Sequence, residues 1–135
     1  MIPINTPPCF RERLRALIGT PYGFRGEGGG LDCWQLVQRA SLDLFGRALP
    51  DYPEVQSFDD VPGTMLHARQ QYAEVGPPLP GDVVMLRVKA VPLHVGLVLE
   101  PPWFLHTLKG REAVAQRYDD RALRATIIGF YRWLA

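Results

Sequence analysis

The chain has 135 residues, the length of one domain, and we predict a single domain over residues 1–135. Fifteen Lys and Arg residues nearly balance 14 Asp and Glu residues, which leaves a formal net charge of +1. That balance argues against a nucleic-acid-binding protein. Hydrophobic residues make up 47% of the chain, which excludes wholesale disorder, and 2 cysteines are too few for a disulfide scaffold.

No apolar run approaches the roughly 18 residues that a membrane-spanning helix needs. The first residues lack the basic stretch and apolar core of a secretory signal. We therefore expect no membrane span, and synthesis in the cytoplasm without a signal peptide.

Helical patterns dominate the first half of the chain. Apolar residues recur there at helical spacing, and Pro and Gly interrupt the pattern at intervals. The predicted elements of this half are a helix capped by Thr6 and ended by Gly19, a glycine-rich loop at 22–30, a helix over Cys33–Phe45 capped by Asp32, a loop at 47–63 and a short helix over Thr64–Val75.

After Gly81 the chain becomes rich in β-branched and aromatic residues. The predicted strands cover Asp82–Val88, Leu93–Leu99, Trp103–Leu108, Ala113–Tyr118 and Thr126–Trp133. Helices followed by strands indicate an α+β fold in which N-terminal helices pack on an antiparallel sheet.

Cys33 is the first candidate for chemistry, since it opens a predicted helix directly after the glycine-rich loop. The unpaired N–H groups of a helix N-terminus favour a thiolate, which is the nucleophilic form of cysteine. The alternative is that Cys33 is a small buried hydrophobic residue. Cys9 and His67 carry no comparable signal, and we interpret them as packing and surface residues respectively.

His94 and His106 lie on two consecutive predicted strands, 12 residues apart. A hairpin turn at residues 100–102 would bring their side chains together. One imidazole could then take the thiol proton of Cys33 while the other orients it. Two satisfied core histidines remain an alternative, as does a zinc site made with Cys33, although no short Cys-x-x-Cys pair supports a zinc site.

Four motifs in order resemble the NlpC-type cell-wall cysteine peptidases. They are Leu17-Ile18-Gly19-Thr20-Pro21-Tyr22 with Asp32-Cys33-Trp34-Gln35-Leu36-Val37, then Leu79-Pro80-Gly81-Asp82, His94-Val95-Gly96 and Phe104-Leu105-His106. The resemblance covers nearly the whole chain and implies a papain-like fold. It also implies hydrolysis of peptide bonds in peptidoglycan stem peptides, often at the D-glutamyl-to-diamino-acid link, without a metal or another cofactor.

The resemblance also assigns roles to single residues. It implies that Cys33 is the nucleophile, His94 the general base and His106 the group that orients His94. Tyr22 matches a tyrosine implicated in substrate binding and the oxyanion region, and Asp32 matches an acidic residue that recognises a substrate amine in some members.

Trp34 departs from the Ser-Gly pair that follows the cysteine in many secreted members. A Trp at this position resembles the phage and prophage tail-associated branch, as does the closing segment 127–132, so we expect other tail proteins as partners and the virion tail as a location. Trp34 also changes the pocket beside the nucleophile. Two alternatives therefore stay open: a structural tail-tip component with a vestigial or peptide-binding site, and an amidase or acyltransferase on the same fold.

Overall fold

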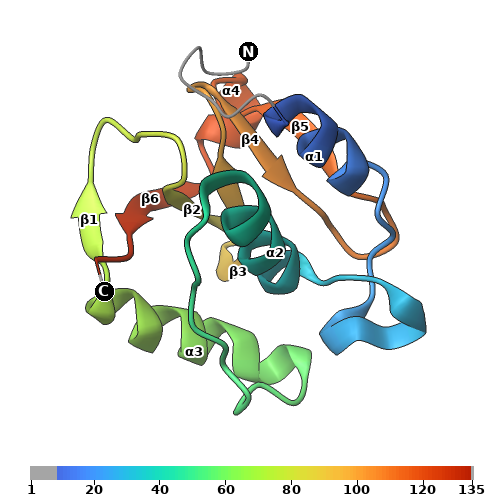
Figure 1. Ribbon diagram of the computed structural model, residues 1–135. Coiled ribbons are helices and arrows are strands. Elements are labelled where there is room, and N and C mark those ends of the chain that lie inside the picture. The colour runs from blue at the N-terminus through green and yellow to red at the C-terminus, as the bar shows by residue number, and fades with distance from the viewer. Residues whose placement is uncertain (1–8, 135) are drawn as a thin grey trace.

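The two halves of the sequence fold into a six-stranded antiparallel sheet with helices on both faces, described by a computed structural model over residues 9–134 (Figure 1). The strand order is β1-β6-β2-β3-β4-β5. The helices are α1 (Phe10–Leu17), α2 (Cys33–Phe45), α3 (Val61–Ala68) and α4 (Arg121–Arg124). The strands are β1 (Ala73–Val75), β2 (Val83–Val88), β3 (Val91–Val98), β4 (Trp103–His106), β5 (Val114–Arg117) and β6 (Ile127–Arg132).

Helix α2 has sequence-encoded signals at both ends. The carboxylate of Asp32 accepts the backbone N–H of Gln35 at 2.9 Å, and the Gln35 side chain accepts the N–H of Asp32 at 3.1 Å. This reciprocal capping satisfies two donors of the first turn and confirms Asp32 as the N-cap. At the other end Gly46 adopts a left-handed conformation with φ of 66°, which is accessible to glycine without strain.

Helix α1 begins later than the sequence indicated. Its first residue is Phe10, and Cys9 occupies the N-cap position. Thr6, the expected cap, lies outside the described residues. Of the apolar residues at helical spacing, Phe10, Leu14 and Leu17 are buried as predicted, whereas Ile18 is the C-cap residue and is exposed.

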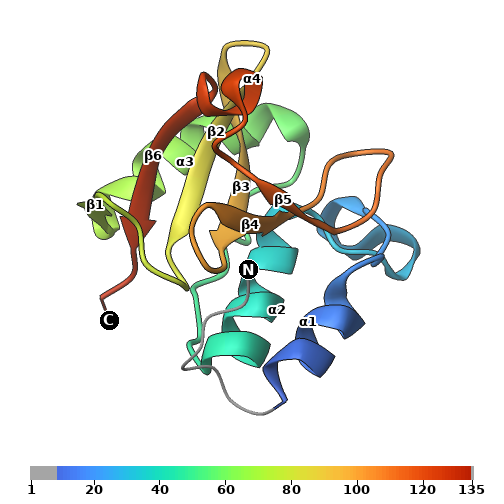
Figure 2. The same ribbon diagram turned by 90° about the horizontal axis from the view of Figure 1, so that it is seen from above.

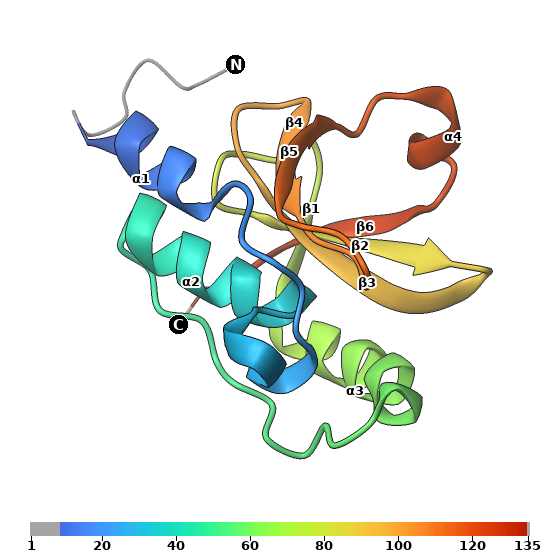
Figure 3. The same cartoon turned by 90° about the vertical axis from the view of Figure 1, so that its right-hand side faces the viewer.

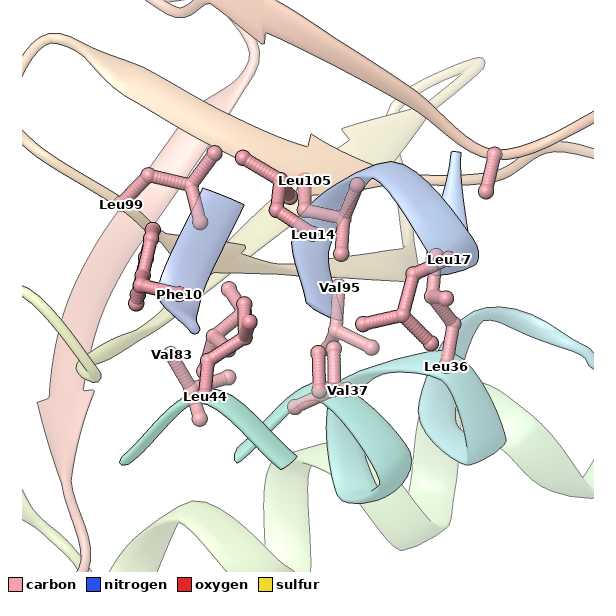
Figure 4. Close-up of a cluster of buried hydrophobic side chains, with 13 residues drawn as sticks. Phe10, Leu14, Leu17, Leu36, Val37, Leu44, Val83, Val95, Leu99 and Leu105 are labelled. Atoms are coloured by element: carbon pink, nitrogen blue, oxygen red, sulfur yellow. The ribbon is translucent and has the colours of Figure 1, made fainter. Parts of the chain in front are cut away.

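Helices α1 and α2 lie side by side against one face of the sheet (Figures 2 and 3). Their apolar side chains interdigitate with those of the strands, as Figure 4 shows for Leu14, Val37, Val95 and Leu105. Burying side chains of this kind contributes about 1.5–3 kcal/mol each. This cluster fixes α2, and with it Cys33, against β3 and β4.

A second, smaller cluster covers the opposite face of the sheet, where α4 lies (Figure 3). Its buried members are Val84, Leu86, Val98 and Phe104. Helix α4 was not predicted from the sequence, because four residues are too few to show a helical period.

The predicted helix over Thr64–Val75 is wrong at both ends. Helix α3 starts at Val61, since Pro62 in its first turn has no N–H to satisfy and has a φ suited to a helix. The helix stops at Ala68, and a short 3-10 turn follows. Residues 73–75 instead form β1, an edge strand that pairs with β6.

Asp82 explains the Leu-Pro-Gly-Asp motif in structural terms. Its buried carboxylate accepts the backbone N–H of Leu79 at 2.7 Å and two hydrogen bonds from the Arg132 guanidinium at 2.8 Å each. The motif therefore closes the turn before β2 and ties it to the end of β6.

No helix within residues 9–134 is both long and apolar enough to cross a membrane.

Candidate active site

Cys33 is the first residue of α2, at the helix N-terminus. The backbone N–H groups of Val95, Trp34 and Cys33 itself approach its sulfur and favour the thiolate. Burial, followed by the neighbouring Asp32 carboxylate, nevertheless raises the pKa of the Cys33 thiol to about 12. The helix terminus is in the expected place, but the thiol of the free protein is neutral at pH 7.

His94 and His106 meet as the hairpin prediction required. Nε2 of His94 lies 2.8 Å from Nδ1 of His106, and both side chains are buried. Strands β3 and β4 pair Val98 with Phe104, so the same register continued by two residues places His106 opposite Gly96. His94 is then the diagonal neighbour of His106 on one face of the sheet, within reach of a direct hydrogen bond.

Gln116 extends this pair by one more strand. Its side-chain oxygen lies 2.8 Å from Nε2 of His106. Gln116 pairs with Phe104 and is therefore the diagonal neighbour of His106 on β5. Gln116 could not be recognised from the sequence, because a single Gln in a weak strand pattern carries no motif; its place opposite Phe104 emerges only from the strand register.

The hydrogen bonds of this chain determine where the protons lie. The amide oxygen of Gln116 can only accept, so Nε2 of His106 donates to it. Nδ1 of a neutral His106 must then accept from Nε2 of His94. Nδ1 of His94 therefore carries no proton, and its lone pair can accept one, as a general base requires.

Both imidazoles are held neutral. Burial, and then the positive charge that His106 would carry, lower the pKa of His94 to about 3. Burial also lowers the pKa of His106, with a further contribution from the Arg111 guanidinium, while the Gln116 hydrogen bond opposes the shift. Two neutral rings can share one hydrogen bond as donor and acceptor, which is what the geometry shows.

A cavity of about 620 Å³ opens beside these groups. Cys33 and His94 both line it, and the Val95 amide that approaches the sulfur directly follows His94 in the chain. The far wall comes from α3 and from the loop before it, through Tyr52, Phe58 and Met65 among others. The loop over residues 47–60, which showed no functional signal in the sequence, thus contributes to the site.

The three expected binding residues also line this cavity. Burial raises the pKa of Tyr22, and the proximity of Cys33 and Asp32 contributes to the shift. Asp32 uses its oxygens to accept the backbone N–H groups of Gln35 and Arg25, at 2.9 Å each. Its buried carboxylate therefore organises the start of α2 and the glycine-rich loop.

Trp34 does not block the cavity. Its indole N–H donates to the carbonyl of Pro50 at 2.9 Å, and its ring packs against Tyr52 with centroids 5.4 Å apart. Trp34 thus holds the loop that forms the far wall. Trp34 itself also belongs to the cavity lining.

The charges around the cavity are mostly positive. Its lining contains Arg25, Arg69, Lys109 and Arg111 against the single carboxylate of Asp32. Arg25 lies 3.6 Å from Asp51, and Lys109 lies over the Phe58 ring at 5.1 Å. An excess of cations around an apolar cavity favours a ligand that carries negative charge.

The zinc alternative does not fit this geometry. The nitrogens of His94 and His106 that could meet are bonded to each other, so the two rings do not converge on one cation. Within residues 9–134 no group of three or more His, Cys, Asp or Glu side chains could hold a metal ion. His67 is exposed near the end of α3, and Cys9 is a half-buried free thiol, as the sequence suggested.

Sequence and structure comparisons agree on one family. The model of the NlpC/P60 family matches residues 19–132, and no curated protein matches the chain. A lipoprotein-like NLP/P60 family protein from Staphylococcus aureus has a TM-score of 0.63 and 20% identity; the alignment covers 93% of this chain and 40% of that one. An NlpC/P60 family protein from Bacillus cereus has a TM-score of 0.65 and 17% identity, with coverage of 98% and 42%.

A third similar structure is the NlpC/p60 domain of the peptidoglycan hydrolase SagA, with a TM-score of 0.58 and 17% identity. It is matched over 91% of this chain and 95% of that one. The chain thus spans about 40% of the Staphylococcus and Bacillus proteins and nearly all of the SagA domain. At these identities the similarity concerns the fold, and the expected α+β papain-like fold is confirmed.

Proposed function

Because the chain belongs to the NlpC/P60 family, we propose that it is a cysteine peptidase that hydrolyses peptide bonds in the stem peptides of bacterial peptidoglycan. The observation that carries this proposal is the hydrogen-bonded series His94–His106–Gln116 beside a cysteine at a helix N-terminus. Cys33 and His94 line one cavity and His106 is hydrogen-bonded to His94 behind it, which supports an assignment as nucleophile, base and orienting group for acyl transfer through a thiol.

The reaction follows from the proton positions. When a substrate carbonyl reaches Cys33, Nδ1 of His94 takes the thiol proton and the sulfur attacks the carbonyl carbon. The N–H of Cys33 at the start of α2 is a natural donor to the developing oxyanion. His94 then protonates the leaving amine, and water hydrolyses the thioester with His94 again as the base. His106 keeps His94 in the required tautomer throughout.

A neutral thiol suits this order of events. Burial and the Asp32 carboxylate disfavour the thiolate before substrate arrives. Proton transfer is then coupled to the attack, rather than completed in the resting enzyme. The backbone N–H groups of Val95 and Trp34 that approach the sulfur stabilise the negative charge that develops on it.

The charges around the cavity support a stem peptide as the substrate. Stem peptides are anionic, and the cavity lining carries four basic side chains. We propose the D-glutamyl-to-diamino-acid link as the bond cleaved, with Asp32 facing a substrate amine and Tyr22 in the binding site. Incubation with defined stem peptides, followed by mass analysis of the products, identifies the bond.

We further propose that the domain acts as part of a phage or prophage tail, with other tail proteins as its partners. The support is the Trp34-Gln35 pair after the nucleophile and the closing segment 127–132, which resemble the tail-associated branch. Mass spectrometry of tail particles purified from a host that carries the gene tests this assignment. Particles that assemble without the chain would contradict it.

The central test compares Cys33→Ala with Cys9→Ala. Cys33→Ala should fold as the wild type and lose all hydrolysis of stem peptides. Cys9 lies at the start of α1 and outside the cavity lining, so Cys9→Ala should keep the wild-type rate. Hydrolysis by the Cys33→Ala variant at the wild-type rate would refute the mechanism.

One observation favours a second function, binding without cleavage. The raised pKa of the Cys33 thiol is also what a vestigial site in a structural tail-tip component would show. Such a protein would bind stem peptides equally well with and without Cys33 and release no product. An amidase would cleave a different amide bond through the same Cys33 thioester, and an acyltransferase would pass the acyl group from Cys33 to an acceptor other than water. Product analysis with a range of acceptors separates both from a peptidase.

A further inference from the structure

Thr107 directly follows His106 and differs from Thr20 and Thr126 in the state of its hydroxyl. Its side chain is only 2% exposed, yet its hydroxyl has no hydrogen-bond partner among residues 9–134. Thr20 and Thr126 show the usual situation, since their hydroxyls donate to backbone carbonyls at 2.7 Å and 2.6 Å. An unpartnered buried hydroxyl destabilises the free protein, so its presence calls for an explanation in function or in a bound ligand.

The position of Thr107 supplies that explanation. It lines the same cavity as Cys33 and His94. Two residues earlier, Leu105 belongs to the cluster under α1 and α2, against which Cys33 also packs. Thr107 directly follows His106, the last residue of β4, and the next two residues, Leu108 and Lys109, also line the cavity. The unsatisfied hydroxyl is a polar group in the wall of the cavity beside the nucleophile.

We propose that Thr107 is a substrate-binding residue whose hydroxyl forms a hydrogen bond with the peptide backbone of the substrate next to the scissile bond. A hydroxyl can donate to a carbonyl and accept from an N–H, and a peptide offers both. The bond satisfies the hydroxyl only when substrate is present, so it contributes to binding without stabilising the empty protein. This inference rests on the proposed function, because it takes a peptide as the ligand.

The test replaces the hydroxyl by a methyl group of the same shape. Thr107→Val should lower kcat/KM on a stem peptide at least tenfold, while its Tm stays equal to or above that of the wild type. Thr107→Ser keeps the hydroxyl and should retain kcat/KM within about threefold. Thr126→Val is the matched control: its hydroxyl bonds Leu123 outside the cavity, so Tm should fall and kcat/KM should not change.

These readouts separate a binding role from a structural one. A lowered Tm in Thr107→Val with unchanged kcat/KM would overturn the inference, since the hydroxyl would then have a partner inside the empty protein, such as a buried water. An unchanged kcat/KM together with an unchanged Tm would overturn it as well.

A binding measurement keeps the inference distinct from the proposed function. The same stem peptide is titrated into Cys33→Ala and into Cys33→Ala/Thr107→Val, where no cleavage occurs. We expect Kd to rise at least tenfold in the double variant. If the wild type binds the peptide without cleaving it, the peptidase proposal fails while this comparison still decides the role of Thr107. Equal Kd values, or no binding to either variant, would overturn the inference.

Discussion

The side-chain oxygen of Gln116 lies 2.8 Å from Nε2 of His106, and through that bond it decides which nitrogen of His94 is free to act as a base. Each member of this series sits on a different neighbouring strand and is the diagonal neighbour of the next. The sheet register therefore performs the orienting role that a carboxylate often has beside a catalytic imidazole.

Gln116→Glu tests this relay through pH dependence. A carboxylate at position 116 stabilises a positively charged His106 and raises its pKa. A doubly protonated His106 donates from both nitrogens, so His94 must accept at Nε2 and carry its proton on Nδ1, where it can no longer take the thiol proton. The acidic limb of the profile of kcat/KM against pH should therefore move to higher pH.

The matched variant is Gln116→Met, which keeps the size of the side chain and removes the acceptor. It should lower kcat about tenfold, which is less than the roughly 10²–10⁴-fold contribution of a group that transfers the proton itself, because residue 116 only orients the base; the acidic limb should not move upward. An unchanged pH profile in Gln116→Glu would mean that residue 116 does not control the protonation of His106.

Alkylation of Cys33 reports the state of its thiol. Because burial and the Asp32 carboxylate raise the pKa of this thiol to about 12, iodoacetamide should react with it slowly at pH 7 and faster as the pH rises. Asp32→Asn removes the negative charge and keeps an acceptor for the Gln35 N–H while losing the one for the Arg25 N–H, so it should lower the thiol pKa and speed alkylation at pH 8.

Peptide mapping separates Cys33 from Cys9, which serves as the internal reference in the same sample. A rate that reaches its plateau below pH 7 would instead show a resting thiolate–imidazolium pair. Loss of that reactivity in His94→Ala would then identify His94 as the partner.

Several features of the site were accessible from the sequence because short-range rules encode them. Asp32 before an apolar helical period predicts the helix terminus that carries Cys33. The 12-residue spacing of His94 and His106 around a Pro-containing turn predicts their meeting across a hairpin. In both cases local geometry alone brings the groups into place.

Other features depend on tertiary packing and left no local signal. Gln116 reaches His106 only through the register of β4 and β5. Thr107 is unusual only because the fold buries it without a partner. The raised thiol pKa also depends on tertiary structure, since burial outweighs the helix terminus on which the sequence argument rested.

Gly96, the last residue of the His-Val-Gly motif, leaves room for an aromatic ring. A Cβ at this position would collide with the side chain of Phe104, whose ring stacks on His106 with centroids 4.2 Å apart. Gly96→Ala should therefore displace Phe104, disturb His106 and lower both Tm and kcat. Overpacking of this kind costs about 1–3 kcal/mol.

Gly63→Ala is the control for the glycine substitution. Gly63 lies in α3 with nothing near the position of an added Cβ. Alanine is the better helix former by up to about 1 kcal/mol, so Tm should stay the same or rise and activity should not change. Equal effects of the two substitutions on thermal unfolding would contradict the packing argument at Gly96.

Asp82 should matter for stability rather than for chemistry. Its carboxylate is buried and holds the N–H of Leu79 and the guanidinium of Arg132. Hydrogen bonds to a charged group contribute about 1.5–3 kcal/mol, so Asp82→Ala should lower the free energy of unfolding by at least that for the Leu79 bond alone. Urea unfolding measures the loss, and kcat of the remaining folded protein should be close to that of the wild type.

Acid should destabilise the fold through the two buried imidazoles. The folded-state pKa of each is lowered, and that of His94 to about 3, whereas unfolded histidine titrates near 6.5. Below pH 6.5 the unfolded state binds more protons than the folded state, so the free energy of unfolding decreases as the pH falls. For each imidazole that stays neutral in the folded protein, the loss is about 1.4 kcal/mol for each pH unit below 6.5.

His106→Gln removes one of the two groups and should make the dependence of the urea midpoint on pH between 6.5 and 5 shallower. An equally steep dependence in that variant would mean that carboxylates, rather than these imidazoles, control acid unfolding.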